Sequence, residues 1–294
     1  MTGSHGLIGS ALIPRLRAGG HRVVRLVRGA TEGADDVRWD PDAGTIDVAG
    51  LEGVDAVVHL AGAGIGDKRW TPARKQLILE SRTRGTGLLA RTLAGLQHPP
   101  ETLVSGSAVG YYGDRGAEML TEASPPGHDF PAQACVAWEA ATVPAAEAGI
   151  RVVTIRTGIV LAAHGGALQR LLLPFKLGLG GRLGSGEQYM SWIALDDELR
   201  AILHVVDNGS IGGAVNLTAP NPVTNRAFTD ALGRAVHRPT LIPTPMFGVK
   251  AVYGGELVAT LLGSQRVSSA KLQSSGFVFA HPDLDAALDD ILHA

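Results

Sequence analysis

The chain has 294 residues, 45% of them hydrophobic and 18% charged, which fits one large globular domain or one domain with a smaller lobe. Its 26 basic and 28 acidic residues nearly balance and form no basic tract, so nucleic-acid and anionic-membrane binding are disfavoured. The single Cys135 excludes an intrachain disulfide, and no apolar run reaches membrane-spanning length. We therefore expect a cytoplasmic protein with no nucleic-acid or membrane partner.

The chain opens on a glycine-rich loop that leads into a helical pattern. Ile8, Leu12 and Leu16 recur every four residues and place an apolar stripe on a helix that ends at Gly19. Glycines three residues apart let the backbone turn tightly and approach a pyrophosphate, toward which the next helix directs its free N–H groups. The triad alone is a weak signal. The predicted phosphate-binding loop is Gly3, Ser4, His5, Gly6, Leu7, Ile8 and Gly9.

The strand that normally precedes such a loop is nearly missing. A strand has about five or six residues, whereas only Met1 and Thr2 stand before Gly3. Either the first strand is supplied in another way, or the given start lies inside the gene. We expect the second alternative, with a few upstream codons that encode an apolar strand.

Strands and helices alternate over the first half of the chain. Thr71 and Pro72 are typical of a helix cap and the first helical position. Alternation at this pitch predicts an α/β fold with a doubly wound parallel sheet, the Rossmann fold, and right-handed crossovers. The predicted strands are 23–27, 54–60, 102–105 and 151–161, and the predicted helices after the first are 71–96 and 132–148.

The pattern becomes less regular after about Gly165. A glycine-rich loop at 178–186 precedes Tyr189, Met190 and Trp192, which form either a substrate wall or a packed strand edge. We predict a nucleotide-binding domain at 1–164 and a smaller substrate lobe at 165–294, with some strands and helices that return to the main sheet. The elements predicted here are a helix capped near Asp196, a strand at 215–217, helices at 224–236 and 269–274, a strand at 277–279 and a helix at 282–292.

Eight segments carry a recognisable pattern: TGSHGLIGS at 2–10, LAGAGI at 60–65, RW at 69–70, SR at 81–82, SGSAVGYYGD at 105–114, RTGIVL at 156–161, LGLGGRLGSGEQYMSWI at 177–193 and LLGSQRV…KLQSSGFVF at 261–279. Together they resemble the atypical extended short-chain dehydrogenase/reductases, and among them the NAD-dependent epimerase/dehydratase-like family with its own C-terminal domain. The resemblance covers almost the whole chain, and its last two segments are the most specific. It implies a Rossmann fold and bound NADP(H).

Arg28 favours NADP(H) over NAD(H). An NAD-selective site places Asp or Glu at the end of the second strand to accept the ribose hydroxyls, whereas this strand ends in Val27 and Arg28. A guanidinium can pair bidentately with a 2′-phosphate that a carboxylate would repel. We predict that Arg28 binds the 2′-phosphate; the alternative is a solvated surface arginine. His5 either touches a phosphate or covers the turn.

Further cofactor contacts are expected where the next strand ends. Leu60, Ala61 and Gly62 follow that strand, and ligands of open parallel sheets bind at such carboxyl ends. Small residues there let adenosine or the inner ribose pack on the backbone, although a simple strand-to-loop turn is the alternative. Ser105 and Gly106 stand at the corresponding end of the strand after it.

The resemblance also places Arg82 at the dinucleotide. A helix arginine paired with Glu80 or Glu139 is the alternative interpretation.

The Tyr-x-x-x-Lys dyad of short-chain dehydrogenases is absent from the sequence. Lysine in that dyad lowers the pKa of the tyrosine, which exchanges a proton with the substrate carbonyl. Alignment on Trp138–Glu139 places Pro131 at the tyrosine position and Cys135 at the lysine position. No lysine occurs between Lys75 and Lys176. The tyrosines are at positions 111, 112, 189 and 253, and four residues further on stand Arg115, Gly116, Ile193 and Leu257.

The remaining catalytic candidates are Ser107, Tyr111 and Tyr112. Ser107 stands near the place of the superfamily's substrate-binding serine, and either tyrosine could donate a proton or be a buried structural residue. Cys135 has apolar neighbours and is interpreted as a buried small hydrophobe rather than a reactive thiol. His59 lies on an apolar strand and is interpreted as a core histidine. No metal site is expected.

We therefore predict an NADP(H)-dependent oxidoreductase or epimerase-like enzyme that acts on a small carbonyl or alcohol. Ser107 would polarise the substrate oxygen, and a tyrosine or water would relay the proton. The alternative is a non-catalytic NADP(H)-binding redox sensor or partner-binding protein. The expected partner is a small-molecule substrate, and the sequence is compatible with a homodimer.

Overall fold

Met1 and Thr2 lie at the centre of the main sheet. The structure is a computed structural model that describes residues 1–293. In it, Leu26 N–H donates to Met1 O at 2.8 Å, and Thr2 N–H donates to Val58 O at 3.0 Å. This two-residue segment therefore stands where the first strand of a doubly wound sheet belongs, between β1 (Arg25–Val27) and β4 (Ala56–His59).

The sheet runs outward from this segment in both directions. On one side, β1 pairs with β2, which pairs with β3, and on the other side β4 is followed by β5, β7 and β11. All named pairs are parallel except β2 with β3. This order is that of a Rossmann fold and confirms the predicted fold class. The bounds are β2 Asp36–Asp40, β3 Thr45–Ile46, β5 Thr102–Ala108, β7 Arg151–Thr157 and β11 Gly213–Leu217.

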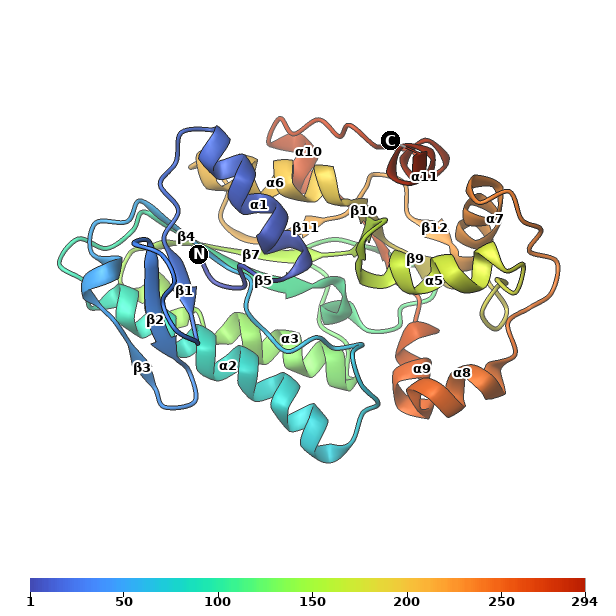
Figure 1. Ribbon diagram of the computed structural model, residues 1–294, viewed down its shortest axis with the longest axis horizontal. Helices are drawn as coiled ribbons and strands as arrows, with labels where there is room; N and C mark the ends of the chain where they lie inside the picture. Colours follow the sequence, from blue (N-terminus) through green and yellow to red (C-terminus); the bar gives the residue numbers. More distant parts are fainter. Residues whose placement is uncertain (294) are drawn as a thin grey trace.

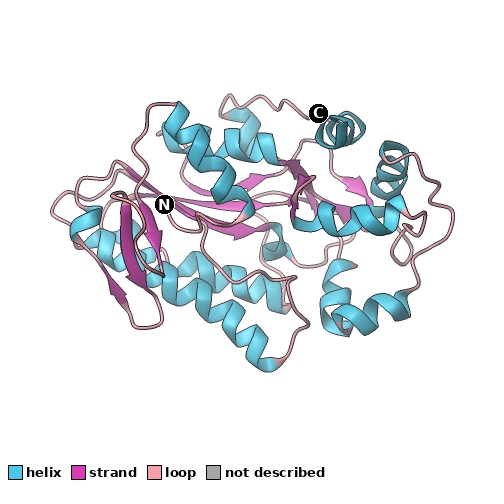
Figure 2. Cartoon of the chain, in the orientation of Figure 1, coloured by secondary structure: helices cyan, strands magenta, loops and turns pink. Residues whose placement is uncertain are grey.

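Helices cover both faces of the sheet (Figures 1 and 2). One face carries α1 (Leu7–Ala18), α6 (Leu195–Asp207) and α10 (Ala270–Ser274), and the other carries α2 (Pro72–Ala94), α3 (Phe130–Ala140) and α4 (Val143–Glu147). Successive strand residues point to opposite faces, so Val104 joins the core under α1 and α6, whereas Leu103 joins the core with α2. Both cores are apolar, and their burial is the main stabilising contribution to the fold.

Local signals in the sequence set several helix ends. The Thr71 hydroxyl accepts a hydrogen bond from Arg74 N–H at 3.1 Å, and Pro72 is the first residue of α2, as predicted. The first helix ends at Ala18 before Gly19, also as predicted.

Three predicted elements were wrong. The helix predicted at 132–148 is two helices, α3 and α4, because Pro144 at the start of α4 has no N–H to continue the ladder. The strand predicted at 151–161 divides at Gly158, where a Cβ would lie 2.6 Å from Ser191 O. Beyond it, β8 (Ile159–Ala162) leaves the sheet and pairs with β10 (Trp192–Ala194).

The third correction concerns 277–279, which is described but forms no strand. Phe277 packs edge-on against Phe279, with ring centroids 4.9 Å apart. Arg200 Nη2 donates to Val278 O at 3.0 Å, so a side chain satisfies a backbone group that a strand neighbour would otherwise bind.

The C-terminal half builds a lobe at the carboxyl end of the sheet and also returns to the main body (Figure 1). Strand β11 and helices α6 and α10 belong to the main layers, and β13 (Arg266–Val267) pairs with β6 (Met119–Leu120). The predicted lobe ends at Ala294, which lies outside the described residues. The other elements are α5 Gly166–Lys176, β9 Tyr189–Met190, β12 Val223–Thr224, α7 Asn225–Ala235, α8 Met246–Tyr253, α9 Gly255–Leu261 and α11 Leu284–His293, with 3-10 turns at Ala49–Leu51 and Val109–Tyr112.

Among residues 1–293, no helix combines the length and the apolar character that a bilayer crossing would demand.

Glu198 on α6 makes the stability of the fold dependent on pH. Its side chain is fully buried, its Oε1 accepts from the Thr157 hydroxyl at 2.9 Å, and its Oε2 has no partner. Burial raises the pKa of this carboxyl to about 8. Between an unfolded pKa of about 4.3 and this value, the native state keeps a proton that the unfolded chain has lost, so this group's effect on stability becomes less favourable as pH rises.

We predict that Glu198→Gln, which keeps the shape but does not titrate, gains stability relative to the parent chain as pH rises from 5 to 8. Thermal unfolding of both proteins at several pH values measures the difference. The exposed Glu187→Gln is the control, with an unchanged offset. A Glu198→Gln difference that stays constant over this range contradicts the burial argument.

Candidate functional site

The glycine loop brings three backbone segments into direct contact. Gly3 has φ of 69°, a value that favours glycine, and Gly6 N–H donates to Gly3 O at 3.0 Å. A Cβ on Gly9 would lie 2.2 Å from Gly3 O, and a Cβ on Gly3 would lie 2.8 Å from the carbonyl carbon of Leu60. Larger residues would therefore separate α1 from the end of β4.

The N-terminus of α1 offers unpaired donors beside this loop. No acidic residue occupies its first turn, and no side chain caps it. The first N–H groups of a helix have no intrahelical acceptor, and the helix dipole favours an anion there. The residues that carry them, Leu7, Ile8 and Gly9, line a hollow that we call the glycine-loop hollow. Its other lining residues are Gly3, Gly6, Leu60, Ile159, Val160, Gly166 and Ala167.

A second hollow lies at the end of β1 and includes His5 of the glycine loop. Arg25 binds Asp36 bidentately, at 2.7 and 2.8 Å, and this ion pair holds the pKa of Asp36 below its usual value. Arg28 has no ion pair with any residue in 1–293 and is exposed. We call this the Arg28 hollow; it has a volume of about 340 Å³ and is lined by His5, Arg25, Val27, Arg28, Gly29, Ala30, Glu32 and Asp36.

The end of β4 is fixed by Thr2. Its hydroxyl accepts from the N–H groups of Leu60 and Ala61, at 3.1 and 3.2 Å, and bonds His59 Nδ1 at 2.8 Å. The other ring nitrogen of His59 bonds the Thr86 hydroxyl at 2.9 Å. Burial lowers the pKa of His59 to about 3, so the ring is neutral at physiological pH. The interpretation of His59 as a core histidine is confirmed.

Arg82 lies between two strand ends. Its guanidinium is 4.8 Å from the Trp138 ring centroid. A Cβ on Gly62 would lie 3.4 Å from Arg82 Cγ, and a Cβ on Gly106 would lie 2.9 Å from Cζ2 and Cη2 of the Trp138 ring. Arg82 Nη1 donates to Ala63 O at 2.9 Å. The Trp138 ring therefore requires a glycine at position 106, whereas a Cβ at position 62 would make only an ordinary contact with Arg82.

The proposed ion-pair partners of Arg82 bind elsewhere. Glu80 pairs with Arg84 at 3.1 Å, and Glu139 pairs with Arg156 at 2.9 Å. Burial lowers the pKa of the Arg82 guanidinium, and its contacts are backbone carbonyls and an aromatic face. The roles of Arg82, Gly62 and Gly106 toward a dinucleotide stay predictions.

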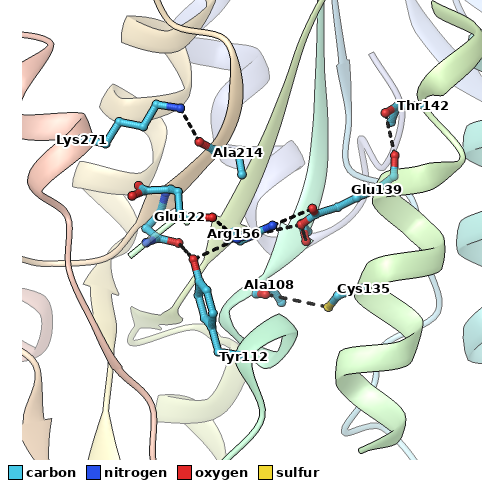
Figure 3. A network of polar contacts seen from close by, with 11 residues as sticks. Ala108, Tyr112, Glu122, Cys135, Glu139, Thr142, Arg156, Ala214 and Lys271 are labelled. Carbon is cyan, nitrogen blue, oxygen red and sulfur yellow. Dashed lines mark hydrogen bonds and ion pairs between the residues drawn. The ribbon is translucent and has the colours of Figure 1, made fainter. Parts of the chain in front are cut away.

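Ser107 is hydrogen-bonded to one member of a buried ion pair. Figure 3 shows that pair, Arg156 and Glu139. Its hydroxyl donates to Glu139 Oε1 at 2.6 Å, and Arg156 Nε and Nη2 bind the same carboxylate at 2.9 Å each. The Arg156 side chain is only 4% exposed. Because the Ser107 O–H group already donates to this carboxylate, only the lone pairs of the serine oxygen are free to accept a hydrogen bond from another group. The neighbouring Ser105 hydroxyl is buried without a partner.

The two tyrosines of the 105–114 segment lie on the other side of Arg156. The Arg156 guanidinium lies 3.4 Å from the Tyr111 ring centroid, and its Nη1 donates to the Tyr112 hydroxyl at 3.1 Å. That hydroxyl donates to Asn216 Oδ1 at 2.6 Å, Tyr112 is fully buried, and burial raises its pKa. Tyr112 is thus held in a structural network, whereas Tyr111 is half-buried.

Helix α3 presents the residues aligned with the missing dyad to the end of β5. The Cys135 thiol donates to Ala108 O at 3.8 Å, and a Cβ on Gly110 would lie 3.4 Å from Pro131 Cβ. Burial raises the pKa of Cys135 to about 11, although the Arg82 charge opposes this rise. The thiol is protonated at neutral pH and behaves as the small hydrophobe that the sequence indicates.

Sequence reasoning missed the importance of Glu139, Arg156 and Asn216. A signal was present for Arg156, because an arginine inside an apolar strand requires a partner. The sequence does not give that partner, since Glu139 lies on a separate element, α3. Asn216, which accepts from the Tyr112 hydroxyl, comes from β11.

One group of potential metal ligands occurs among the described residues: Asp196, Asp197 and His281. The buried Asp197 carboxylate already accepts from Ala280 N–H and His281 N–H, each at 2.8 Å, and pairs with Arg200 at 2.7 Å. These bonds attach the chain at 280–281 to α6. The absence of a metal site stays a prediction.

The doubly wound sheet and its glycine loop define a protein of the Rossmann class. Residues 1–218 match the NAD dependent epimerase/dehydratase family, and residues 244–291 match a domain of unknown function, DUF1731. The chain therefore belongs to the NAD-dependent epimerase/dehydratase family.

The similarity to known proteins covers the full length. An epimerase family protein of Mycobacterium bovis is 46% identical over 288 residues, 98% of this chain and 95% of the relative. The human epimerase family protein SDR39U1 is 36% identical over 293 residues, 99% of this chain and 98% of the relative.

Two crystal structures extend this comparison. That of human SDR39U1 isoform 2 with NADPH superposes with a TM-score of 0.90 at 34% identity, over 99% of this chain and 97% of that chain. A nucleoside-diphosphate sugar epimerase from Corynebacterium glutamicum gives a TM-score of 0.83 at 37% identity, over 99% of this chain and 57% of that chain.

Arg156→Met is predicted to destabilise the protein by about 3–5 kcal/mol, because it leaves the Glu139 carboxylate buried without its charge partner. The double variant Arg156→Met/Glu139→Leu removes both charges and should be less destabilised than Arg156→Met. Urea unfolding measures both. The exposed pair Arg226–Glu187 is the control, and Arg226→Met should cost less than about 1 kcal/mol. A double variant as unstable as Arg156→Met would contradict this account of the pair.

Proposed function

We propose that the chain binds NADP(H) and transfers a hydride at a small carbonyl or alcohol carbon. The observation that carries the cofactor assignment is the unpaired Arg28 in a hollow beside the glycine loop. The human relative crystallised with NADPH supports it, since it shares the fold over almost the whole chain.

The residues present fit the three parts of such a cofactor. Arg28 would pair with the 2′-phosphate, and the N–H groups of Leu7, Ile8 and Gly9 at the start of α1 would bind the pyrophosphate. His5 lines the Arg28 hollow and its neighbour Gly6 lines the glycine-loop hollow, so one dinucleotide that crosses the loop would reach both. When bound, the nicotinamide supplies or accepts the hydride.

Ser107 would hold the substrate oxygen. Its proton points to Glu139, which Arg156 fixes in place, so the serine oxygen accepts a hydrogen bond from a substrate hydroxyl. This geometry favours the alcohol side of the reaction. For a carbonyl substrate, a water or Tyr111 would have to donate the proton. The Tyr-x-x-x-Lys acid is absent, so we expect a rate lower by about 10²–10⁴-fold than with such a dyad.

The competing proposal is a non-catalytic NADP(H)-binding sensor or partner-binding protein. It is supported by Pro131 and Cys135 at the aligned dyad positions, since neither can exchange a proton at neutral pH. The Ser107 hydroxyl, which is held by its hydrogen bond to Glu139, favours an enzyme instead.

Arg28→Ala is predicted to weaken NADPH binding by about 10- to 100-fold, the loss expected for a charge-assisted bidentate contact. Its affinity for NADH should change by less than about twofold. Calorimetric titration measures both, with Arg22→Ala, an exposed arginine near the start of β1, as the control. An unchanged NADPH preference would remove Arg28 from the site.

Ser107→Ala is predicted to lower turnover by at least about tenfold, because the variant cannot hold the substrate oxygen. The assay follows reduced-nicotinamide absorbance, with NADP⁺ and a panel of secondary alcohols, and with NADPH and a panel of aldehydes, ketones and quinones. Turnover that persists in the variant would defeat the catalytic assignment. A parent chain that binds NADPH yet turns over nothing in either panel would favour the sensor.

A further inference from the structure

We propose that Arg266 binds an anionic group of the substrate, so that the chain acts on a hydroxy or oxo compound that carries a carboxylate or a phosphate. The proposal rests on the proposed hydride transfer and adds the chemical class of the molecule that gives or receives the hydride. Arg266 belongs to the C-terminal segment that matches the domain of unknown function, and it lines neither hollow of the cofactor site.

The Arg266 guanidinium lacks a partner although it is half-buried. Its Nε is buried without a hydrogen-bond acceptor, and the group forms no hydrogen bond or ion pair within residues 1–293. A cation held partly out of water without a counter-charge costs free energy, which a bound anion would recover. The other arginines that lack both kinds of partner in this range are all exposed to water: Arg17, Arg28, Arg38, Arg69 and Arg91.

The acidic residues of the neighbouring segment, 114–122, are bound to other groups. Asp114 accepts from the N–H of Ser264 at 3.0 Å, and Glu118 pairs with Arg115 at 2.8 Å. Glu122 accepts from a backbone N–H of β11 at 2.9 Å. The segment that pairs with β13 therefore does not supply the missing counter-charge.

Tyr189 supports the guanidinium without using its hydrogen-bond donors. Arg266 Cζ lies 4.9 Å from the Tyr189 ring centroid. An aromatic ring attracts a guanidinium through its face, and the terminal N–H groups stay free for a carboxylate or a phosphate. Tyr189 is half-buried on β9, beside the glycine-rich loop 178–186, where a substrate wall was one of the two alternatives predicted.

The backbone on both sides of Arg266 is fixed. Gln265 N–H donates to Tyr189 O at 3.1 Å, and Val267 N–H donates to the Ser191 hydroxyl at 2.9 Å. That hydroxyl donates to Gln265 O at 2.8 Å, and the chain between α9 and α10 therefore passes directly beside β9 (Figure 1). A cation on a fixed segment is positioned before the ligand arrives, which lowers the entropic cost of binding.

Val267 connects this segment to the Ser107 site. It is buried in an apolar cluster against which Tyr111 packs. The Tyr111 ring centroid lies 3.4 Å from the guanidinium of Arg156, whose carboxylate partner accepts from the Ser107 hydroxyl. Two contact points for one substrate follow: Ser107 for the reacting oxygen, and Arg266 for the anionic group.

The first test measures anion binding by nuclear magnetic resonance. The full chain, isotopically labelled at arginine and saturated with NADP⁺, is titrated with sodium phosphate and with sodium succinate at constant ionic strength. The Arg266 Nε–H signal, assigned by its loss in Arg266→Gln, should shift and saturate with at least one of the two anions. The signal of Arg226, which is paired with Glu187, is the control and should not shift.

The second test compares anions with neutral molecules of similar shape. With NADP⁺, hydroxy acids of increasing length are compared with their amides, and glycerol 3-phosphate is compared with glycerol. The anion should be preferred by about 10- to 100-fold in kcat/KM, the size of one charge-assisted contact. A preference for the acids identifies a carboxylate, and a preference restricted to glycerol 3-phosphate identifies a phosphate.

Arg266→Gln should remove this preference by raising the KM of the anion, with the KM of the neutral partner changed by less than about twofold. Arg266→Lys keeps the charge and should retain part of the preference, which separates anion binding from a merely structural role. Arg226→Gln is the matched control and should retain all of it.

Equal use of anions and neutral partners, with no effect of Arg266→Gln, would overturn the role of Arg266 and leave the proposed hydride transfer intact. If the Arg266 signal saturates but no compound is turned over, the anion site stands and the proposed hydride transfer fails. If NADP⁺ binds and neither anion shifts the signal, the anion site fails and the cofactor assignment survives.

Discussion

The structure depends on the close backbone contact at the first crossover. Gly3, Gly9 and Leu60 approach so closely that a single added Cβ would meet backbone atoms at 2.2 or 2.8 Å. This contact seats the start of α1 against the carboxyl edge of the sheet, where its unpaired N–H groups face outward. It also places His5 beside Arg28, although the two belong to different elements. The glycine loop therefore borders both hollows, and the cofactor proposal rests on this placement.

A second constraint operates further along the sheet. Arg156 and Glu139 form a buried ion pair between β7 and α3. Glu139 also accepts from the Ser107 hydroxyl, and Arg156 also donates to the Tyr112 hydroxyl and to Glu122 O. A buried pair adds little net stability, but removing one member is costly. The pair also holds the Ser107 hydroxyl, because that hydroxyl donates to the fixed Glu139 carboxylate. This is the pre-organisation that a binding or catalytic serine requires.

The sequence was most informative where the signal was local. The glycine spacing, the cap at Thr71 and the alternating strands and helices predicted the Rossmann fold, because each depends on residues close together in the chain. The break between α3 and α4 also has a local cause, Pro144, although the prediction for 132–148 was one continuous helix. The false strand at 277–279 arose because a run of apolar residues does not reveal that Arg200 takes its backbone carbonyl.

The candidate site was less predictable because its contacts join distant elements. The partner of Arg156 lies 17 residues away on a helix, and Asn216 comes from the last strand of the sheet. Likewise, no spacing rule predicts that the Arg82 guanidinium stacks on the Trp138 ring. Nor does spacing predict that Asp36 pairs with Arg25 and not with Arg28. These outcomes are decided by the fold as a whole.

A crystal structure of this chain grown with NADP⁺ tests the central claim most directly. The account predicts the 2′-phosphate within hydrogen-bonding distance of the Arg28 guanidinium, and the pyrophosphate on the N–H groups that begin α1. A 2′-phosphate directed into solvent, away from Arg28, would contradict it.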